Sequence, residues 1–195
     1  MSKKESTFMN MIITLLVITL IAGVSLGLIN DLTVGPKAQA KLERKISALK
    51  NVLPEFNNNP VDDIRLIKSD LAKDSIEIYT AFLNKKQTGI AIVSSSEKGY
   101  SGLIKIMVGF NPDGVIKNIT VLEQKETPGL GTKMKGEKFI RQFRGKHPSN
   151  FNLKVKKDQG EVDALTGATI TTRAFTEATQ MAYDVFVENQ SQSEN

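Results

Sequence analysis

The most strongly apolar stretch lies near the N-terminus, where residues 8–30 carry no charged side chain. Its core, residues 11–29, approaches the roughly 20 apolar residues that an α-helix needs to cross the hydrocarbon layer of a membrane. We therefore expect a transmembrane anchor at 8–30, preceded by an N-terminal tail at 1–7. A cleaved signal peptide is the alternative, because Ala38-Gln-Ala40 resembles a cleavage site. The apolar core is long, however, and this site lies well beyond its end.

Residues 31–60 are expected to form a juxtamembrane amphipathic helix followed by a loop. Pro54 would end this helix, and Asn57-Asn-Asn-Pro60 is typical of a loop. Within residues 38–53, apolar side chains recur at the three- and four-residue spacing of one helix face, at Leu42, Ile46, Leu49 and Leu53. We expect this face to pack against the chain's own folded domain.

Four later segments have the composition and alternation of β-strands. They are residues 75–83, 88–94, 102–110 and 115–122. The sequence Asn111-Pro-Asp-Gly114 is a strong turn between the last two, which predicts an antiparallel hairpin. Because strands adjoin strands instead of alternating with helices, we expect an α+β fold: an antiparallel sheet with flanking helices, preceded by one N-terminal transmembrane helix.

The C-terminal part of the chain is predicted to contain a short helix at 137–143, a strand at 153–156 and a closing helix at 170–187. Residues 189–195 are predicted to be a polar tail. The closing helix has an apolar face, formed by Ala174, Ala178, Met181, Ala182, Val185 and Phe186.

The composition limits the kinds of binding or catalytic site that this chain can form. The 195-residue chain has a formal net charge of +5, but its lysines are scattered among acidic residues, so nucleic-acid binding is not expected. It contains no cysteine, which excludes disulfides, thiolate-bound zinc and cysteine-held iron–sulfur clusters. With His147 as the single histidine and no calcium-type carboxylate loop, no metal site is expected. Any redox cofactor would have to be organic.

The segment from Asp163 to Thr172 has a composition that is unusual for a purely structural segment. It lies just before the closing helix, whose unpaired N–H groups and positive dipole end favour a phosphate. Gly167 permits close approach of the backbone to a ligand. Four hydroxyl side chains crowd this helix end: Thr166, Thr169, Thr171 and Thr172. Simple capping of the helix is the alternative, but four threonines exceed what a cap requires.

A second unusual segment, Glu126-Thr-Pro-Gly-Leu-Gly131, follows the last of the four predicted strands. Pro128 and Gly129 are the natural central pair of a type II turn. Leu130, exposed between two glycines, would present an apolar contact beside bare backbone, a surface suited to a flat aromatic ring. A plain turn is the alternative interpretation.

Together the two segments resemble the signatures of the FMN-binding domain family. This family is found in the G subunit of Rnf complexes and in the C subunit of sodium-translocating NADH:quinone reductases. Asp163-Ala-Leu-Thr-Gly-Ala-Thr169 matches its flavinylation pattern of an Asp, two variable residues, Ser or Thr, then Gly-Ala-Thr. The resemblance implies that Thr169 carries FMN through a phosphoester, left by a separate magnesium-dependent flavin transferase that cuts FAD. Asp163 would then serve transferase recognition or turn structure.

The resemblance also implies which residues surround the FMN. Arg173 would either neutralise the phosphate or form an outward ion pair. No catalytic residues are expected, because a relay does not require bond-making side chains. The expected cofactor-binding residues near the phosphate are Thr166, Gly167, Ala168, Thr171 and Thr172, and those of the second signature are Glu126, Thr127, Pro128, Gly129, Leu130 and Gly131.

The length of the chain favours the Rnf G subunit, with residues 61–188 as the FMN-binding domain. By resemblance, such a complex moves electrons between ferredoxin and NAD and couples them to ion transport. The chain would be a redox subunit of this translocase, without substrate turnover of its own. Its partners would be the other membrane and cluster-bearing subunits and, during maturation, the flavin transferase.

The resemblance places the chain in the inner membrane as a single-pass protein, with the FMN domain on the periplasmic or extracytoplasmic side. The charges that flank the apolar span do not decide this orientation. Three alternatives remain: the quinone reductase C subunit, a stand-alone flavinylated membrane redox protein, and a membrane-anchored adaptor without redox function.

Overall fold

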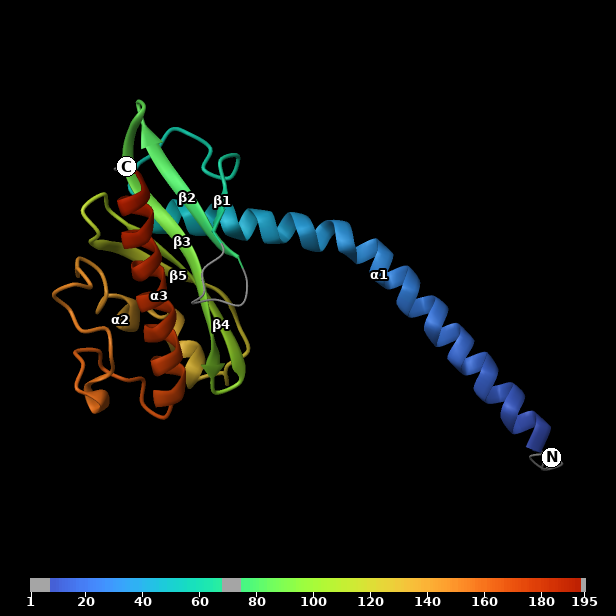
Figure 1. Ribbon diagram of the computed structural model, residues 1–195. Helices are drawn as coiled ribbons and strands as arrows, with labels where there is room; N and C mark the ends of the chain where they lie inside the picture. The colour runs from blue at the N-terminus through green and yellow to red at the C-terminus, as the bar shows by residue number, and fades with distance from the viewer. Residues whose placement is uncertain (1–7, 68–74, 194–195) are drawn as a thin grey trace. The chain divides into compact units, whose positions relative to one another are not determined.

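The computed structural model describes residues 8–67 and 75–193 of the chain (Figure 1). The chain divides into two compact units, with the boundary between Glu43 and Arg44. Each unit is described by itself below.

The first unit contains most of one long helix, α1, which runs from Phe8 to Val52. Its N-terminal part is long and apolar enough to cross a membrane, by length and composition, and none of its most apolar window is buried in the protein. The sequence predicted two helices here, but the helix is continuous. Pro36 lies inside it and removes one backbone hydrogen bond without ending it.

The last turns of α1 belong to the second unit and pack against its sheet. The prediction that the apolar face docks onto the chain's own domain is confirmed for Leu49 and Leu53, which are buried. Gly109 permits this approach, because a Cβ atom there would lie 2.9 Å from Cβ of Val52. Ile46 is half-buried, so the face is covered progressively toward the end of the helix.

The sheet of the second unit is antiparallel, with its five strands in the order β1-β2-β3-β4-β5. The four predicted strands and the hairpin at Asn111–Gly114 are confirmed. A three-residue edge strand was missed, because a run this short has no detectable alternation. The strands are β1 Arg65–Ile67, β2 Ile76–Leu83, β3 Lys86–Gly99, β4 Gly102–Phe110 and β5 Ile116–Gln124.

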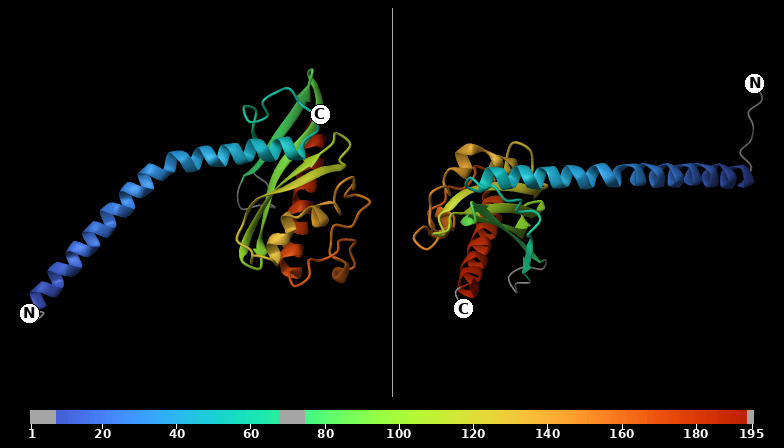
Figure 2. Two further views of the ribbon diagram at one scale, coloured as in Figure 1. Left: turned by 180° about the vertical axis from the view of Figure 1, so that it is seen from behind. Right: turned by 90° about the horizontal axis from the view of Figure 1, so that it is seen from above.

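Helix α3, Thr169–Ser193, covers one face of the sheet, and the end of α1 covers the other (Figures 1 and 2). The α3 face holds the larger core, in which Phe139, Phe143 and Phe175 pack at centroid distances of 5.1 to 5.4 Å. The two covered faces explain why the central strands are buried on both sides. This arrangement confirms the predicted α+β class.

The helix α3 is longer than predicted. It begins one residue earlier, at Thr169, and continues into the segment predicted as a polar tail, as far as Ser193. Asn189 is buried, and Gln190 donates a hydrogen bond to the carbonyl oxygen of Pro112 at 2.8 Å. These tertiary contacts keep a polar stretch helical, which an apolar pattern could not reveal.

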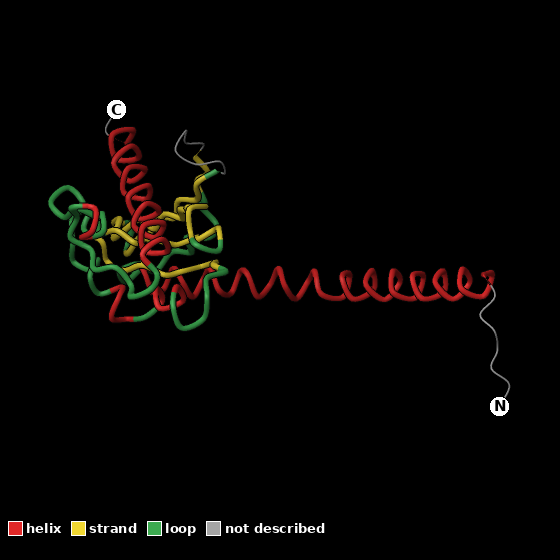
Figure 3. Tube along the Cα trace, turned by 90° about the horizontal axis from the view of Figure 1, so that it is seen from below, coloured by secondary structure: helices red, strands yellow, loops and turns green. Residues whose placement is uncertain are grey.

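Between β5 and α3 the chain is mainly loop (Figure 3). The helix predicted at 137–143 is confined to α2, Glu137–Ile140. The strand predicted at 153–156 is wrong, since only an isolated bridge joins Val155 to Val162. Leu153 of this segment packs in the main core, while the backbone hydrogen bonds of the segment are made within a local turn. Two 3₁₀ helices complete this stretch, η1 Gly131–Lys135 and η2 Lys156–Asp158.

Candidate functional site

The two unusual segments of the sequence meet in one pocket of about 570 Å³. Three parts of the fold build it: the turn between β3 and β4, the loop after β5, and the N-terminus of α3. Its lining residues are Tyr100, Glu126, Thr127, Leu130, Gly131, Gly167, Ala168, Thr169, Ile170 and Thr171.

Glu126 links the three parts of this pocket. The side chain is only 4% exposed. Its Oε2 accepts a hydrogen bond from the Thr171 hydroxyl at 2.7 Å, and its Oε1 accepts one from the backbone N–H of Ser101 at 3.0 Å. Because a buried carboxylate needs such partners, Glu126 fixes the loop after β5 to the start of α3.

Two glycines let the segments approach each other closely. A Cβ atom on Gly131 would lie 2.7 Å from both Cβ and Oε2 of Glu126 and 3.0 Å from the Thr171 hydroxyl. Gly167 has a φ of +75°, and a Cβ atom there would lie 3.3 Å from Cδ2 of Leu130. At Gly131 a side chain would clash with Glu126, and at Gly167 the positive φ would strain any other residue, so both positions favour glycine.

The loop after β5 forms the predicted turn. The backbone N–H of Leu130 donates to the carbonyl oxygen of Thr127 at 3.2 Å, and Gly129 has a φ of +76°, as a type II turn requires. Leu130 is 43% exposed. Thr127 and Leu130 therefore face the pocket, while Pro128 and Gly129 shape the turn and do not line it.

The four threonines at the start of α3 have different environments. Thr171 is buried and bonded to Glu126. Thr172 is buried and donates to the carbonyl oxygen of Ala168 at 2.9 Å, so its hydroxyl serves the helix itself. Thr166 is exposed and does not line this pocket. Thr169 lines the pocket and is half-buried, and its hydroxyl makes no hydrogen bond to any residue that the structure describes.

The first half of the threonine-rich segment lines a different pocket, of about 660 Å³. Asp163 and Thr166 face this second pocket. The Gln142 amide holds the loop there, since its Oε1 accepts from the Asp163 N–H at 2.8 Å and its Nε2 donates to the Asp163 carbonyl at 3.3 Å. The Asp163 carboxylate pairs with Lys156 at 2.7 Å.

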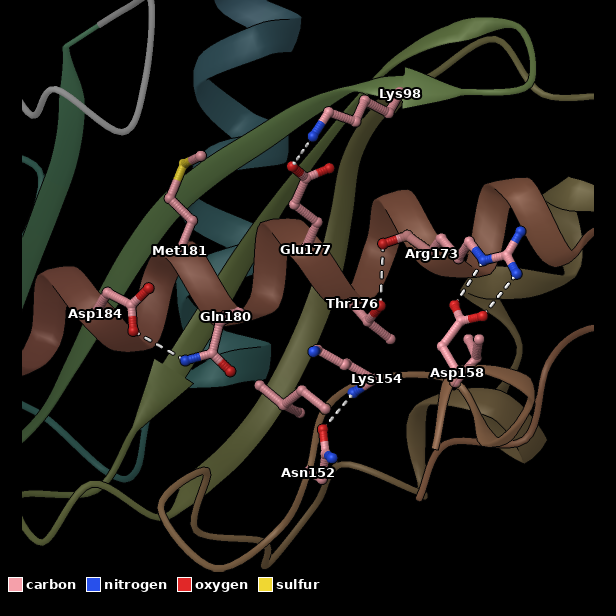
Figure 4. Close-up of a pocket in the computed structure, with 12 residues that line it drawn as sticks. Lys98, Asn152, Lys154, Asp158, Arg173, Thr176, Glu177, Gln180, Met181 and Asp184 are labelled. Atoms are coloured by element: carbon pink, nitrogen blue, oxygen red, sulfur yellow. Dashed lines mark hydrogen bonds and ion pairs between the residues drawn. The ribbon is translucent and has the colours of Figure 1, made fainter. Parts of the chain in front are cut away.

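Arg173 forms the outward ion pair, the second of its two predicted alternatives. Its guanidinium donates two hydrogen bonds to Asp158, at 2.7 and 2.8 Å (Figure 4). These bonds lower the pKa of the Asp158 carboxyl and raise that of Arg173.

This ion pair lies at a third pocket of about 750 Å³ along α3, which a second pair, between Lys98 and Glu177, also lines (Figure 4). Although it is larger than the pocket with Thr169, it contains no residue of either signature. Four of its charged side chains form these two ion pairs, and its shape alone does not indicate a ligand.

Tyr100 is the pocket residue that the sequence did not indicate. It lies in the turn between β3 and β4 and is 71% exposed. A large aromatic side chain exposed at the edge of a pocket is typical of a surface that contacts a ligand or partner. No local motif identifies it, because it enters the pocket only through the pairing of β3 with β4.

Potential metal ligands are not grouped in the described parts of the chain. Across residues 8–67 and 75–193, no three His, Cys, Asp or Glu side chains come together as a possible metal site.

Comparison with known proteins agrees with these features. Residues 99–184 match the FMN-binding domain family. The G subunit of the Na⁺-translocating ferredoxin:NAD⁺ oxidoreductase complex of Acetobacterium woodii is 31% identical over 183 residues, which cover 88% of each chain. The G subunit of the ion-translocating oxidoreductase complex of Vibrio atlanticus is 33% identical over 186 residues, 89% of each chain.

Among solved structures, NqrC of Shewanella oneidensis matches with a TM-score of 0.46 and 24% identity, over 62% of this chain and 63% of that one. The match to the FMN-binding domain includes the two signature segments and Tyr100. The sequence relationships extend over nearly the whole chain. The chain therefore belongs to the family of G subunits of ion-translocating oxidoreductase complexes, and it contains their FMN-binding domain.

Proposed function

We propose that this chain carries FMN covalently on Thr169 and relays electrons as the G subunit of an Rnf-type ferredoxin:NAD oxidoreductase complex. One observation carries the site assignment. Of the four clustered threonines, Thr169 combines a place in the pocket with a hydroxyl free of hydrogen bonds to the described residues. Thr171 and Thr172 are buried and bonded, and Thr166 lies on another pocket.

The pocket fits a flavin mononucleotide in size and chemistry. Its volume of about 570 Å³ lies within the range of about 300 to 1,000 Å³ that is common for cofactor sites. A phosphate on Thr169 would lie at the N-terminus of α3, where unpaired N–H groups and the helix dipole favour an anion. Leu130 and Tyr100 offer apolar and aromatic surfaces for a flat ring.

The attachment requires an enzyme other than this chain. A flavin transferase would use FAD: the Thr169 hydroxyl oxygen forms a bond to the phosphorus on the flavin side, and the bond from that phosphorus to the bridging oxygen breaks. AMP leaves, and the hydroxyl proton passes to a base of the transferase. Glu126, the acidic residue of the pocket, already accepts two hydrogen bonds, which supports a base supplied from outside.

In electron transfer the protein positions the cofactor and does not make or break substrate bonds. FMN supplies the capacity to accept and donate electrons. The α3 N-terminus would hold its phosphate, Glu126 would keep the loop after β5 in place, and Leu130 would limit the access of water to the ring. No independent substrate turnover is needed for this role.

The proposed location follows from α1 and from the relatives' complexes. We infer an uncleaved single-pass anchor in the inner membrane, with the FMN domain on the periplasmic or extracytoplasmic side. Its partners would be the membrane and cluster-bearing subunits of the same complex. The long apolar N-terminal helix supports membrane attachment, and the names of the relatives support a place in a multi-subunit complex.

The experiment that tests the proposal is intact mass and in-gel flavin fluorescence of the denatured chain, produced with and without the transferase. The expected result is a transferase-dependent gain of one FMN less one water, on the peptide with Thr169. Thr169→Val should abolish the label, whereas Thr166→Val should leave at least part of it. An unmodified wild-type chain would contradict the proposal and favour a membrane adaptor without redox function.

A further inference from the structure

The pocket beside the attachment site, which Asp163 and Thr166 line, is strongly cationic. Lys133, Lys138 and Arg141 all line it. All three are exposed, and none makes an ion pair with a residue that the structure describes. Nearby, Arg144 pairs with Glu137 and Lys156 pairs with Asp163, whereas Lys135 is exposed and makes no ion pair with a described residue. Three unpaired cations therefore gather on one side of the loop that ends at Thr169.

The acidic residue of this pocket does not neutralise the three cations. The Asp163 carboxylate is already paired with Lys156. The base of the pocket is firm, because Phe139 is only 3% exposed and packs in the main core. Gln142 holds the backbone of Asp163 with two hydrogen bonds. The loop is thus displayed in a fixed conformation beside a positive surface.

The two pockets divide the flavinylation motif between them. Gly167, Ala168 and Thr169 face the proposed FMN pocket, whereas residues 163–166 face the cationic pocket. A bound flavin would therefore leave the first half of the motif uncovered. That half, and the cations beside it, must interact with something other than the flavin if they have a binding role.

We propose that Lys133, Lys138 and Arg141 form the docking surface for an acidic face of the enzyme that attaches FMN to Thr169. This inference rests on the proposed function. An enzyme docked here contacts residues 163–166 directly, three residues before its target, without occupying the pocket that receives the flavin. Charge complementarity of this kind accelerates encounter and fixes orientation more than it adds affinity.

The test uses the full-length chain in detergent, with the transferase, FAD and Mg²⁺. The variant combines Lys133→Glu, Lys138→Glu and Arg141→Glu. The matched control reverses three exposed lysines outside both pockets, Lys86→Glu, Lys117→Glu and Lys154→Glu, with the same change in net charge.

We expect kcat/KM for flavinylation to fall roughly tenfold or more in the pocket variant, with kcat little changed. The reason is that the charges mainly accelerate the encounter between the chain and the transferase. The wild-type rate should also fall as salt rises, whereas the rate of the pocket variant should be nearly insensitive to salt. Flavinylation of the pocket variant at the rate of the control would overturn the inference. Equal losses in both triple variants would also overturn it, since net charge alone would then be responsible.

A binding measurement separates this inference from the proposed function. Thr169→Val, which cannot be labelled, should still bind the transferase, and the added charge reversals should weaken that binding. If wild-type chain is never labelled, the proposed function fails. If labelling is normal but the charge reversals prevent assembly with other subunits, the cationic pocket belongs to a different partner and the docking inference fails.

The single variant Lys138→Glu guards against misfolding of the triple variant. Its thermal unfolding should match that of the wild type, because the side chain is exposed and unpaired among the described residues. We expect a loss in kcat/KM of roughly threefold, because a single charge at the rim of a protein–protein interface mainly affects the association rate. An unchanged kcat/KM in a folded Lys138→Glu chain counts against the docking surface.

Discussion

Glu126 is a buried carboxylate that accepts hydrogen bonds from two distant segments, the turn before β4 and the start of α3. Such a group stabilises the fold only while both partners are present, because an unpaired buried polar atom is costly. The same side chain lines the proposed FMN pocket. At the scale of single residues, the stability of the site and its shape therefore depend on one carboxylate.

Glu126→Gln tests this dependence. The amide nitrogen cannot accept a hydrogen bond, so one donor, the Ser101 N–H or the Thr171 hydroxyl, loses its partner. We expect a loss of about 1 to 3 kcal/mol in the free energy of unfolding, measured by denaturant titration of the full chain in detergent. Glu123→Gln, at an exposed position on β5, should have little effect. Equal stability of the two variants would contradict the bridging role.

Tyr100 offers a second prediction at the residue scale, one that rests on the proposed function. A ring stacked on the flavin should quench its fluorescence and shield it from solvent. Tyr100→Ala should leave Thr169 labelled to the same extent, because the hydroxyl is untouched, but raise the flavin fluorescence of the folded protein. Unchanged fluorescence in a fully labelled variant would show that Tyr100 does not contact the ring.

At the scale of elements, a polar cluster ties the end of α1 to β2. Lys45 donates to Glu77 at 2.7 Å, and the Tyr79 hydroxyl donates to the same oxygen at 2.5 Å. Burial by itself would raise the pKa of Glu77, but the hydrogen bonds from Lys45 and Tyr79 outweigh it and hold that pKa below its usual value. Burial and the same hydrogen bond raise the pKa of Tyr79.

This pKa shift predicts a pH dependence for the attachment of α1. A carboxyl whose pKa is lowered by folding stabilises the protein above the unfolded value, near 4.5. That stabilisation is lost as the pH falls through the lowered value in the folded protein. Glu77→Gln should therefore be less stable than wild type at pH 7, and the difference should shrink below about pH 4. Denaturant unfolding at several pH values checks this; a difference that does not vary with pH would contradict it.

At the scale of the whole molecule, the chain joins an apolar helix to a domain with a cofactor-sized pocket. The Gly35-Pro36 pair lies within α1 beyond the apolar run, and the helix continues through it to the sheet. Under the proposed function, the apolar part of α1 would serve as the membrane anchor of the chain that carries the redox group.

The topology is testable on intact cells. We expect the mature chain to keep residues 8–30, to remain in the membrane after carbonate extraction, and to expose its domain to protease added from the extracytoplasmic side. N-terminal mass spectrometry and protease treatment of spheroplasts provide the measurements. Cleavage after Ala40 would replace the anchor by a signal peptide, and protection of the domain would reverse the proposed orientation.

Several features were predictable from sequence because their causes are local. The charge-free run predicts the apolar helix, and alternation with the turn at Asn111–Gly114 predicts the hairpin of β4 and β5. The positive φ values of Gly129 and Gly167 agree with glycines placed where other residues would be strained. The two signature segments could likewise be identified from the sequence as short motifs.

Only the tertiary structure decided how these motifs work together. The bond between Glu126 and Thr171 joins residues 45 positions apart, and no periodicity encodes such a contact. The fold also separates Thr166 from Thr169, although the sequence presents them as neighbours. The segment at 153–156 has the composition of a strand, but it finds no partner strand beyond one bridge. The sequence by itself determined most of the elements and both motifs, because local propensity sets them. Packing over long distances decided which threonine lines the pocket of Glu126 and Leu130 with its hydroxyl free.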